Sequence, residues 1–258
     1  MQTAALLTLG GRVKPGHDGL WGGKHILNAR PRTLPPMRQL HHFQLSPFCR
    51  RVRLILAEKR LTFDGHAERP WEPKDELFPL DPAKQLPVLI ETDGAKLSDA
   101  QAICEYLEEL HPDPPLMPKR AGDRAEVRRL CAWFDRFFFG EITSVVVREK
   151  YLKRFRQVPT PEPDLAALRR ALDATRRNMA FIEMLIDERD CLAGPLSLAD
   201  FTAAAHISCA DYFGDVPWGS FPKARNWYAR MKSRPSFRPL LADSVPGLSP
   251  PAHYANLD

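Results

Sequence analysis

The chain has no concentration of cysteine. Its five cysteines lie far apart and form neither a C-x-x-C pair nor a cluster with histidine; they are Cys49, Cys104, Cys131, Cys191 and Cys209. An odd number of scattered thiols does not build a disulfide framework and lacks the spacing of a zinc site. We therefore expect no metal site, and we expect a protein of the reducing cytoplasm.

Long apolar runs and blocks of like charge are also missing from the 258 residues. No stretch approaches the roughly 18 consecutive apolar residues of a membrane-spanning helix, so we expect no membrane span. The 37 basic and 32 acidic residues leave a net charge of only +5, and 44% of the residues are hydrophobic. This composition is typical of a folded protein with a core. No nucleic-acid-binding motif accompanies the mild positive charge, so we expect no nucleic acid partner.

Residues 1–36 differ from the rest of the chain. They hold six of the 14 glycines and show no sustained apolar period. Their one apolar run, at residues 4–9, is too short for a signal peptide and follows no basic residue. We expect this segment to be a disordered arm. The alternative is a true start at Met37, directly before the first strand-like segment.

Residues 37–111 alternate strand-like and helical segments. Ser46 before Pro47 is a helix start signal, because the hydroxyl caps the helix and proline needs no amide in the first turn. Ser98, with Gln101 three residues later, has the capping-box pattern of a second helix. Strand-like segments cover residues 39–44, 62–68, 87–90 and 95–97. The order β-α-β-β-β-α predicts a small mixed four-stranded sheet with helices packed on it.

Strand signals end before the proline-dense residues 112–118, which we predict to be a linker. Over residues 119–240, apolar residues recur at helical spacing. Asp164 is placed to cap a long helix, and Ser197 forms a capping-box pattern with Asp200. We expect this part to be an all-α domain.

Three motifs carry a resemblance to a known family. They are S-P-F-C-R-R-V-R-L-I-L-A-E-K at residues 46–59, Q-L-P-V-L at residues 85–89 and S-L-A-D-F at residues 197–201. In this order they resemble the glutathione S-transferase superfamily over about residues 38–240. The resemblance implies a thioredoxin-like N-terminal domain with the mixed sheet, an all-helical C-terminal domain, and a cis peptide bond before Pro87.

The resemblance also implies a glutathione site. In that family a residue in the place of Ser46 stabilises the glutathione thiolate, and the positive potential at a helix N-terminus favours an anion. The alternative is that Ser46 only caps its helix. Where the family has a serine that binds the γ-glutamyl carboxylate, this chain has Ala100, and such a hydrogen bond is worth ~1.5–3 kcal/mol. We therefore predict a vestigial site formed by Ser46, Phe48, Leu86, Pro87, Asp99 and Ala100.

Cys49 and the arginines that follow it each have two interpretations. Because Ser46 stands where a redox protein has its first cysteine, no dithiol exists, and we expect Cys49 to be a small buried residue. Arg50, Arg51 and Arg53 either bind an acidic partner or form a solvated helix face.

The basic segments and the C-terminal tail are candidate partner sites. Positive residues crowd residues 148–156 and residues 222–239, and they would steer an acidic partner, although a solvated face is the alternative. The proline-rich tail at residues 241–258 either docks on a partner as an extended peptide or packs as a strap on its own domain. The candidate partner contacts are Arg148, Lys150, Lys153, Arg154, Tyr254 and Leu257.

The motifs, Ala100 and the tail together resemble one branch of the superfamily, whose dimeric proteins bind FtsZ filaments in bacterial cell division. We therefore predict a homodimer that binds FtsZ polymers without a cofactor, in the cytoplasm and with the division site as a candidate location. The alternative is an enzyme that conjugates glutathione to electrophiles, with Ser46 as the thiolate stabiliser. A chaperone-like or stress adaptor is a third hypothesis, and it has no distinctive residue.

Overall fold

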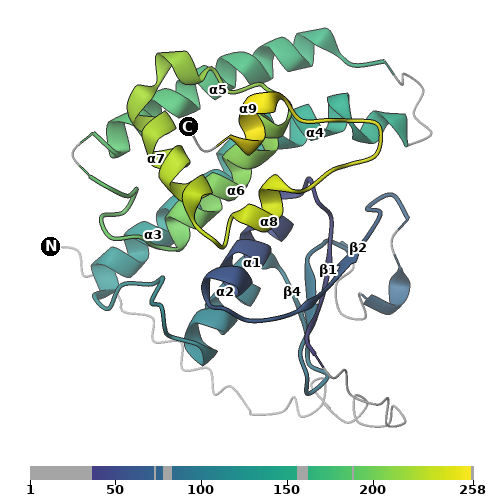
Figure 1. Ribbon diagram of the computed structural model, residues 1–258, viewed down its shortest axis with the longest axis vertical. Helices are drawn as coiled ribbons and strands as arrows, with labels where there is room; N and C mark the ends of the chain where they lie inside the picture. Colours follow the sequence, from purple (N-terminus) through teal and green to yellow (C-terminus); the bar gives the residue numbers. More distant parts are fainter. Residues whose placement is uncertain (1–36, 73, 78–82, 156–161, 188, 257–258) are drawn as a thin grey trace, which may run out of the picture. The chain divides into compact units, whose positions relative to one another are not determined.

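The structure, a computed structural model, combines a small sheet with a larger helical part (Figure 1). It describes residues 37–72, 74–77, 83–155, 162–187 and 189–256. The predicted arm at residues 1–36 lies outside the described residues, and so does Leu257. The strands all precede residue 99 and the elements after α2 are helical, which confirms the predicted fold class.

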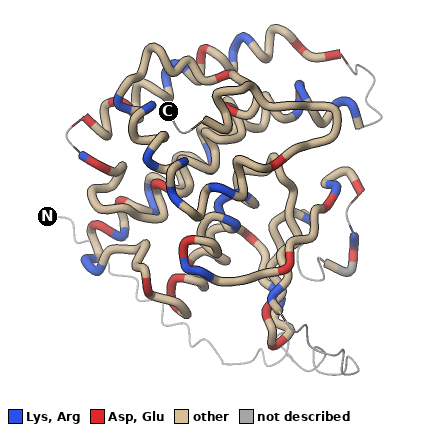
Figure 2. The backbone as a smooth tube through the Cα atoms, viewed as in Figure 1, with Lys and Arg blue, Asp and Glu red and all other residues tan. Residues whose placement is uncertain are grey.

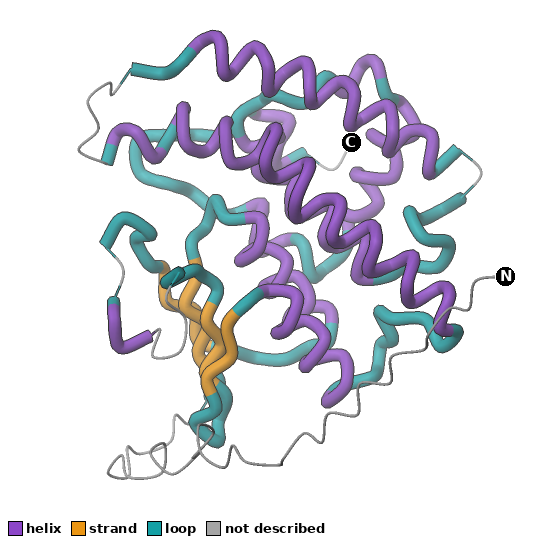
Figure 3. The backbone as a smooth tube through the Cα atoms, turned by 180° about the vertical axis from the view of Figure 1, so that it is seen from behind, coloured by secondary structure: helices purple, strands orange, loops and turns teal. Residues whose placement is uncertain are grey.

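Four short strands form one mixed sheet in the order β2-β1-β3-β4. β1 and β2 are parallel, whereas the β1–β3 and β3–β4 pairs are antiparallel. All four strands coincide with predicted strand segments, and Figure 3 shows them side by side. Their bounds are Gln39–His42 (β1), Asp64–Ala67 (β2), Val88–Ile90 (β3) and Lys96–Ser98 (β4).

Two helices follow strands of the sheet: α1 (Pro47–Glu58) follows β1, and α2 (Ala100–Leu110) follows β4. The predicted start of α1 is confirmed. The Cys49 amide donates to Oγ of Ser46 at 3.3 Å, and Pro47 occupies the first turn.

The start of α2 differs from the prediction. Ser98 is not the cap, because it is the last residue of β4. The cap is Asp99, whose carboxylate accepts the Ala102 amide at 2.9 Å and whose φ of 70° turns the chain from strand to helix. The side chain of Gln101 donates to Glu105 on the same helix instead of closing a capping box.

The helical part contains one long run of three elements without a break. The sequence predicts helices over residues 123–139 and 142–155, but it does not predict that the middle element, η2, is a π-helix. The bounds are Ala121–Trp133 (α3), Phe134–Thr143 (η2), Ser144–Lys150 (α4), Leu165–Leu185 (α5), Leu198–Tyr212 (α6) and Pro222–Ser233 (α7). Short 3₁₀ turns are Asp75–Leu77 (η1), Leu152–Arg154 (η3) and Trp218–Ser220 (η4).

Helix α6 lies at the centre of the core. All of its residues are buried, and it packs against α1, α3, η2 and α7. Its predicted capping box is confirmed, with the Ser197 amide donating to Asp200 at 3.0 Å. One apolar cluster joins sheet residues such as Leu40 with α6 residues such as Ile207. Since both parts share this core, the domain boundaries near residues 112–118 stay a prediction.

The C-terminal segment packs against its own chain. It contains α8 (Arg238–Leu241) and α9 (Ala252–Ala255), and we call residues 242–256 the C-terminal strap. Val245 and Tyr254 of the strap lie in a buried cluster with Phe43 and Leu45. This position corresponds to the strap interpretation of the tail.

Charged residues of both signs are interspersed along the helices (Figure 2). None of the helices in the described residues is long and apolar enough to cross a membrane. Within the same residues, no group of three His, Cys, Asp or Glu side chains is arranged to hold a metal ion.

Candidate functional site

The sheet brings three of the predicted site residues to one edge. Val88, the first residue of β3, pairs with His41 near the end of β1 and with Ser98 at the end of β4, because both strands are antiparallel to β3. β1 leads into Ser46, Pro87 precedes β3, and Asp99 follows β4. The Leu86–Pro87 bond is cis, as the resemblance implies. This is the order of elements that the resemblance implies for a glutathione site.

Ser46 lies half-buried at the start of α1. Its oxygen already accepts the Cys49 amide, so the residue serves as the helix cap. A hydroxyl is also able to donate a hydrogen bond, and the helix N-terminus adds positive potential. The geometry is thus compatible with both interpretations of Ser46.

Cys49 is buried beneath Ser46, and its Sγ accepts the Phe43 amide at 3.3 Å. Burial raises the pKa of this thiol to about 11. The side chain therefore stays a neutral thiol near neutral pH, as expected of a buried residue rather than a redox cysteine.

The start of α2 lacks the hydroxyl that the resemblance implies for a carboxylate. The exposed Asp99 uses its own carboxylate as the helix cap. Ala100 is 3% exposed and packs into the core with Ile103. Ser98 lies on β4 and is exposed, so its hydroxyl does not replace the missing one.

Among the described residues, Phe48 contacts other aromatic rings and Leu86 lines a small hollow. The Phe48 ring packs edge-on against Phe139, with centroids 4.8 Å apart, and also against His206. The hollow beside Leu86, lined also by Glu68 and Leu77, encloses about 10 Å³. Ligand pockets typically enclose about 300–1,000 Å³, so this hollow is too small for a tripeptide.

Both predictions for the three arginines of α1, contact with an acidic partner and a solvated helix face, are wrong. Arg50, Arg51 and Arg53 are buried, and each is bound within the chain, so none of them forms a solvated face or contacts a partner. Arg53 makes two hydrogen bonds to Asp243 of the strap, at 2.7 and 2.9 Å. Periodicity alone would place these charges outside, and only their distant partners explain their burial.

Arg51 belongs to a buried polar chain beside Phe48. Its Nη1 donates to Asp135 of the π-helix at 2.9 Å, and Asp135 also bonds His206 at 3.1 Å. Burial raises the pKa of Asp135, but the bonds to His206 and Arg51 outweigh it and hold the pKa below its usual value. The carboxylate is therefore charged and ties α1, η2 and α6 together.

The four basic partner candidates lie together on α4 and η3. Glu149 bonds both Arg148, at 2.8 Å, and Lys153, at 2.6 Å. Lys150 pairs with Asp215, and Arg154 donates to the Gly247 carbonyl at 3.0 Å. The side chain of Arg148 is still 55% exposed. Arg148 and Arg154 therefore remain accessible at the surface.

Tyr254 does not reach the surface. Its side chain is 0% exposed and contacts Arg50 and Tyr212. We therefore assign it an internal role in place of the predicted partner contact. Leu257, the other tail candidate, lies outside the described residues.

An aromatic cluster next to these residues was not predicted. Trp71 stacks on Phe155 with centroids 4.7 Å apart, Tyr151 contacts both of these rings, and Phe43 contacts Trp71. Phe155 is 40% exposed. The sequence carries no signal for this cluster, because Trp71 and Phe155 come from loops far apart in the chain.

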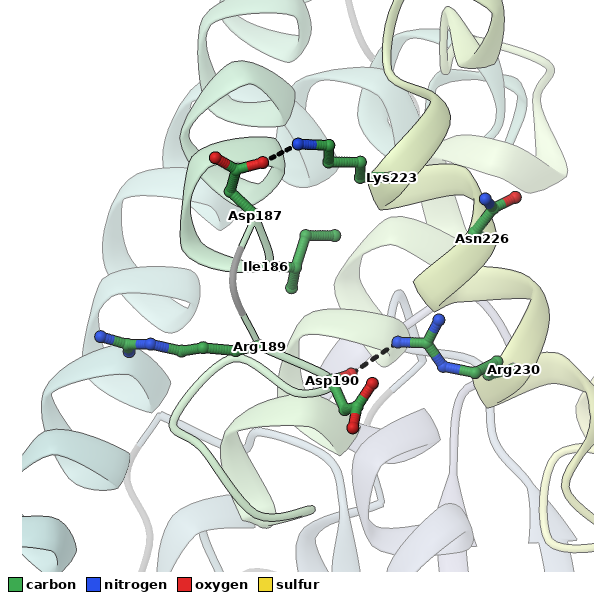
Figure 4. Close-up of a pocket in the computed structure, with 7 residues that line it drawn as sticks. All are labelled: Ile186, Asp187, Arg189, Asp190, Lys223, Asn226 and Arg230. Atoms are coloured by element: carbon green, nitrogen blue, oxygen red, sulfur yellow. Dashed lines mark hydrogen bonds and ion pairs between the residues drawn. The ribbon is translucent and has the colours of Figure 1, made fainter.

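A separate pocket of about 380 Å³ lies between the end of α5 and α7 (Figure 4). Two of its three basic residues are engaged within the chain: Lys223 pairs with Asp187, and Arg230 donates to the Asp190 carbonyl at 2.6 Å. The basic segment at residues 222–239 is thus partly a set of internal contacts, which also include the pair of Arg234 with Glu58.

Comparison with known proteins shows that the chain is similar to glutathione S-transferases. Residues 40–115 match the family "Glutathione S-transferase, N-terminal domain". A solved glutathione S-transferase from Rhodospirillum rubrum F11 is 48% identical, with a TM-score of 0.82, and the match covers 86% of this chain and 100% of that one.

Two further matches indicate one family within the glutathione S-transferases. FtsZ-localized protein A of Caulobacter vibrioides is 49% identical over 225 residues, which are 86% of this chain and 98% of the relative. The solved structure of FzlA from C. crescentus is 48% identical with a TM-score of 0.82, and the match covers 86% of this chain and 99% of that one. The chain belongs to the family of FtsZ-localized protein A, within the glutathione S-transferase superfamily. The branch that the sequence indicates is thereby confirmed.

Proposed function

We propose that this protein binds FtsZ polymers as a homodimer at the bacterial division site and does no glutathione chemistry. The observation that carries the proposal is its 49% identity to FtsZ-localized protein A over almost the whole of that relative. Ala100 supports it, because the hydroxyl that the resemblance implies for a glutathione carboxylate is missing there.

The surface that we propose for the polymer consists of Arg148, Arg154, Phe155 and Trp71, and we call it the α4–η3 surface. It combines accessible guanidinium groups with a partly exposed aromatic stack. Arginine and aromatic side chains are enriched among the residues that dominate binding energy in protein interfaces. Positive charge also steers an acidic partner to the site.

A dimer would strengthen such a weak surface. Two copies of one site on a rigid dimer bind a repeating polymer with a high effective concentration for the second contact. We propose that the second copy packs on η2 and α5, which lie against each other and carry exposed apolar side chains. These side chains are Phe137, Leu165, Leu172 and Met184.

Co-sedimentation with FtsZ polymers at near-physiological salt tests the proposal. The wild-type protein is expected in the pellet, and Arg148→Glu with Arg154→Glu is expected to weaken binding about tenfold, because both charges become repulsive. Arg225→Glu is the matched control, since Arg225 is exposed on α7 away from this surface.

A wild-type protein that stays wholly in the supernatant would reject the function. Equal losses in the double variant and in the Arg225 control would reject the α4–η3 surface and leave the function in place. Turnover of an aromatic halide with glutathione, abolished by Ser46→Ala, would support the enzymatic alternative instead.

A further inference from the structure

The C-terminal strap is bound to two parts of the body at once. Asp243 receives both hydrogen bonds from Arg53 near its start. Further along, the Tyr212 hydroxyl accepts the Val245 amide at 3.2 Å and donates to the Leu248 carbonyl at 2.9 Å. The strap therefore lies fixed along α1 and α6 (Figure 1).

Arg50 connects the strap to the β1–α1 loop, which leads into Ser46. Its guanidinium is 0% exposed; Nε donates to the Gln44 carbonyl at 2.7 Å, and Nη1 donates to Ser208 at 2.8 Å and to the Tyr254 hydroxyl at 2.9 Å. Gln44 lies two residues before Ser46, in the β1–α1 loop. One buried charge thus binds the loop, α6 and the strap, and a buried charge that loses a partner is strongly disfavoured.

Tyr254 is suited to hold this position. Burial raises its pKa to about 12, so the hydroxyl stays protonated near neutral pH. It accepts from Arg50 and donates to the Leu240 carbonyl at 3.3 Å. Its ring packs edge-on against Tyr212, with centroids 5.2 Å apart.

The strap also reaches the α4–η3 surface. The Gly247 carbonyl accepts from Arg154 at 3.0 Å, and Gly247 has a φ of 73°, which favours glycine. Val147 and Tyr151 of the α4–η3 segment share one apolar cluster with Val245 and Tyr254. The same cluster contains Phe43 and Leu45 of the β1–α1 loop.

We propose that Arg50 and Tyr254 are positioning residues through which the C-terminal strap holds the β1–α1 loop and the α4–η3 surface in one arrangement. By fixing the α4–η3 surface, the strap then affects how tightly a partner binds there, without itself contacting the partner. This consequence for a partner rests on the proposed function, whereas the coupling within the chain does not.

Hydrogen exchange of the full chain under native conditions tests the coupling. In Tyr254→Phe, which keeps the ring, we expect about tenfold faster exchange at the amides of Ser46 and Cys49 and also at those of Arg154 and Phe155. That factor corresponds to the loss of one hydrogen bond from a charged donor. Amides of α5, which lies outside the cluster, are expected to keep their rates.

Tyr106→Phe is the matched control, because no hydrogen bond of its hydroxyl is found among the described residues, and we expect it to change none of these rates. Asp243→Asn weakens the strap at its other anchor and is expected to give the same pattern as Tyr254→Phe. Equal acceleration at all amides, α5 included, would mean only global destabilisation and would overturn the proposal. Acceleration confined to residues 252–256, or no change, would overturn it as well.

Binding of the same variants to FtsZ polymers separates the two proposals. Weaker binding by Tyr254→Phe with its arginines intact supports positioning of the surface. If the wild-type protein does not bind and the exchange pattern is nevertheless found, the proposed function fails and the coupling stands.

Discussion

Ala100 stands at the position where the resemblance implies a serine that binds the carboxylate of glutathione. The cis bond before Pro87 and the hydroxyl group of Ser46 are present. The hydroxyl at the start of α2 is not, and Ala100 packs into the core instead. The affinity for glutathione therefore depends on how much free energy of binding a hydroxyl at position 100 would contribute.

Calorimetric titration with glutathione measures that contribution. We expect a dissociation constant in the millimolar range or weaker for the wild-type protein. Ala100→Ser is expected to strengthen binding by about tenfold, because one hydrogen bond to a carboxylate is restored. Micromolar affinity of the wild-type protein would contradict a vestigial site.

His42 is a second residue with a measurable effect, here on stability. Burial first, and the charge of Arg53 second, lower its pKa from 6.5 to about 4. The folded state therefore favours the neutral ring, and stability that is present above pH 6.5 is lost as the pH falls towards 4. The difference corresponds to about 3 kcal/mol.

Urea unfolding between pH 7 and pH 4 measures this loss. The wild-type free energy of unfolding is expected to fall steeply over this range, and His42→Gln, which does not titrate, is expected to flatten the slope. A variant with the wild-type slope would assign the pH dependence to other groups.

Among the elements, α1 contacts several different parts of the molecule. It begins at the site edge, packs on α2 and α6, and sends its arginines to the strap and the π-helix. Its cap should therefore matter for stability as well as for any ligand.

Ser46→Ala is expected to lower the free energy of unfolding by about 1 kcal/mol, because the Cys49 amide loses its acceptor. Ser46→Thr keeps an acceptor and is expected to lose much less. Urea denaturation of both variants at one pH gives the comparison. Equal losses in the two variants would show that the hydroxyl does not act as the cap.

Local signals explain which elements were predictable from sequence. Ser46, Asp164 and the Ser197–Asp200 box cap helices through neighbours within three residues, so the sequence alone contains the whole interaction. The predicted start of α2 is wrong by one residue. The strand β4 continues through Ser98, and the chain turns into the helix at Asp99, which has a positive φ.

The rest of the candidate site depends on contacts across long sequence separations. Arg53 meets Asp243, and Trp71 meets Phe155, in each case across more than 80 residues. No periodicity encodes such a meeting. The buried arginines and the aromatic cluster consequently become visible only in the folded chain, as does the internal position of Tyr254.

For the whole molecule, assembly is the property to measure. Phe137 on η2 is 57% exposed, and we expect Phe137→Asp to convert a dimer into a monomer, because a buried charge opposes packing of a second copy. Light scattering coupled to size-exclusion chromatography gives the mass. Leu110→Asp, at a side chain that is 54% exposed at the end of α2, is the control. A monomeric wild-type protein would contradict the proposed homodimer.

The internal partners of α1 also determine when this chain is able to fold during synthesis. Arg51 needs Asp135, Arg50 needs Ser208 and Tyr254, and Arg53 needs Asp243. While the ribosome has produced only β1 to β4 with α1 and α2, these partners do not yet exist. Arg50 and Arg51 then have only the Gln44 carbonyl and Gln101 to bind, and the guanidinium groups stay largely hydrated. Helix α1 therefore reaches its final environment only once Asp135, Ser208, Asp243 and Tyr254 have all been made.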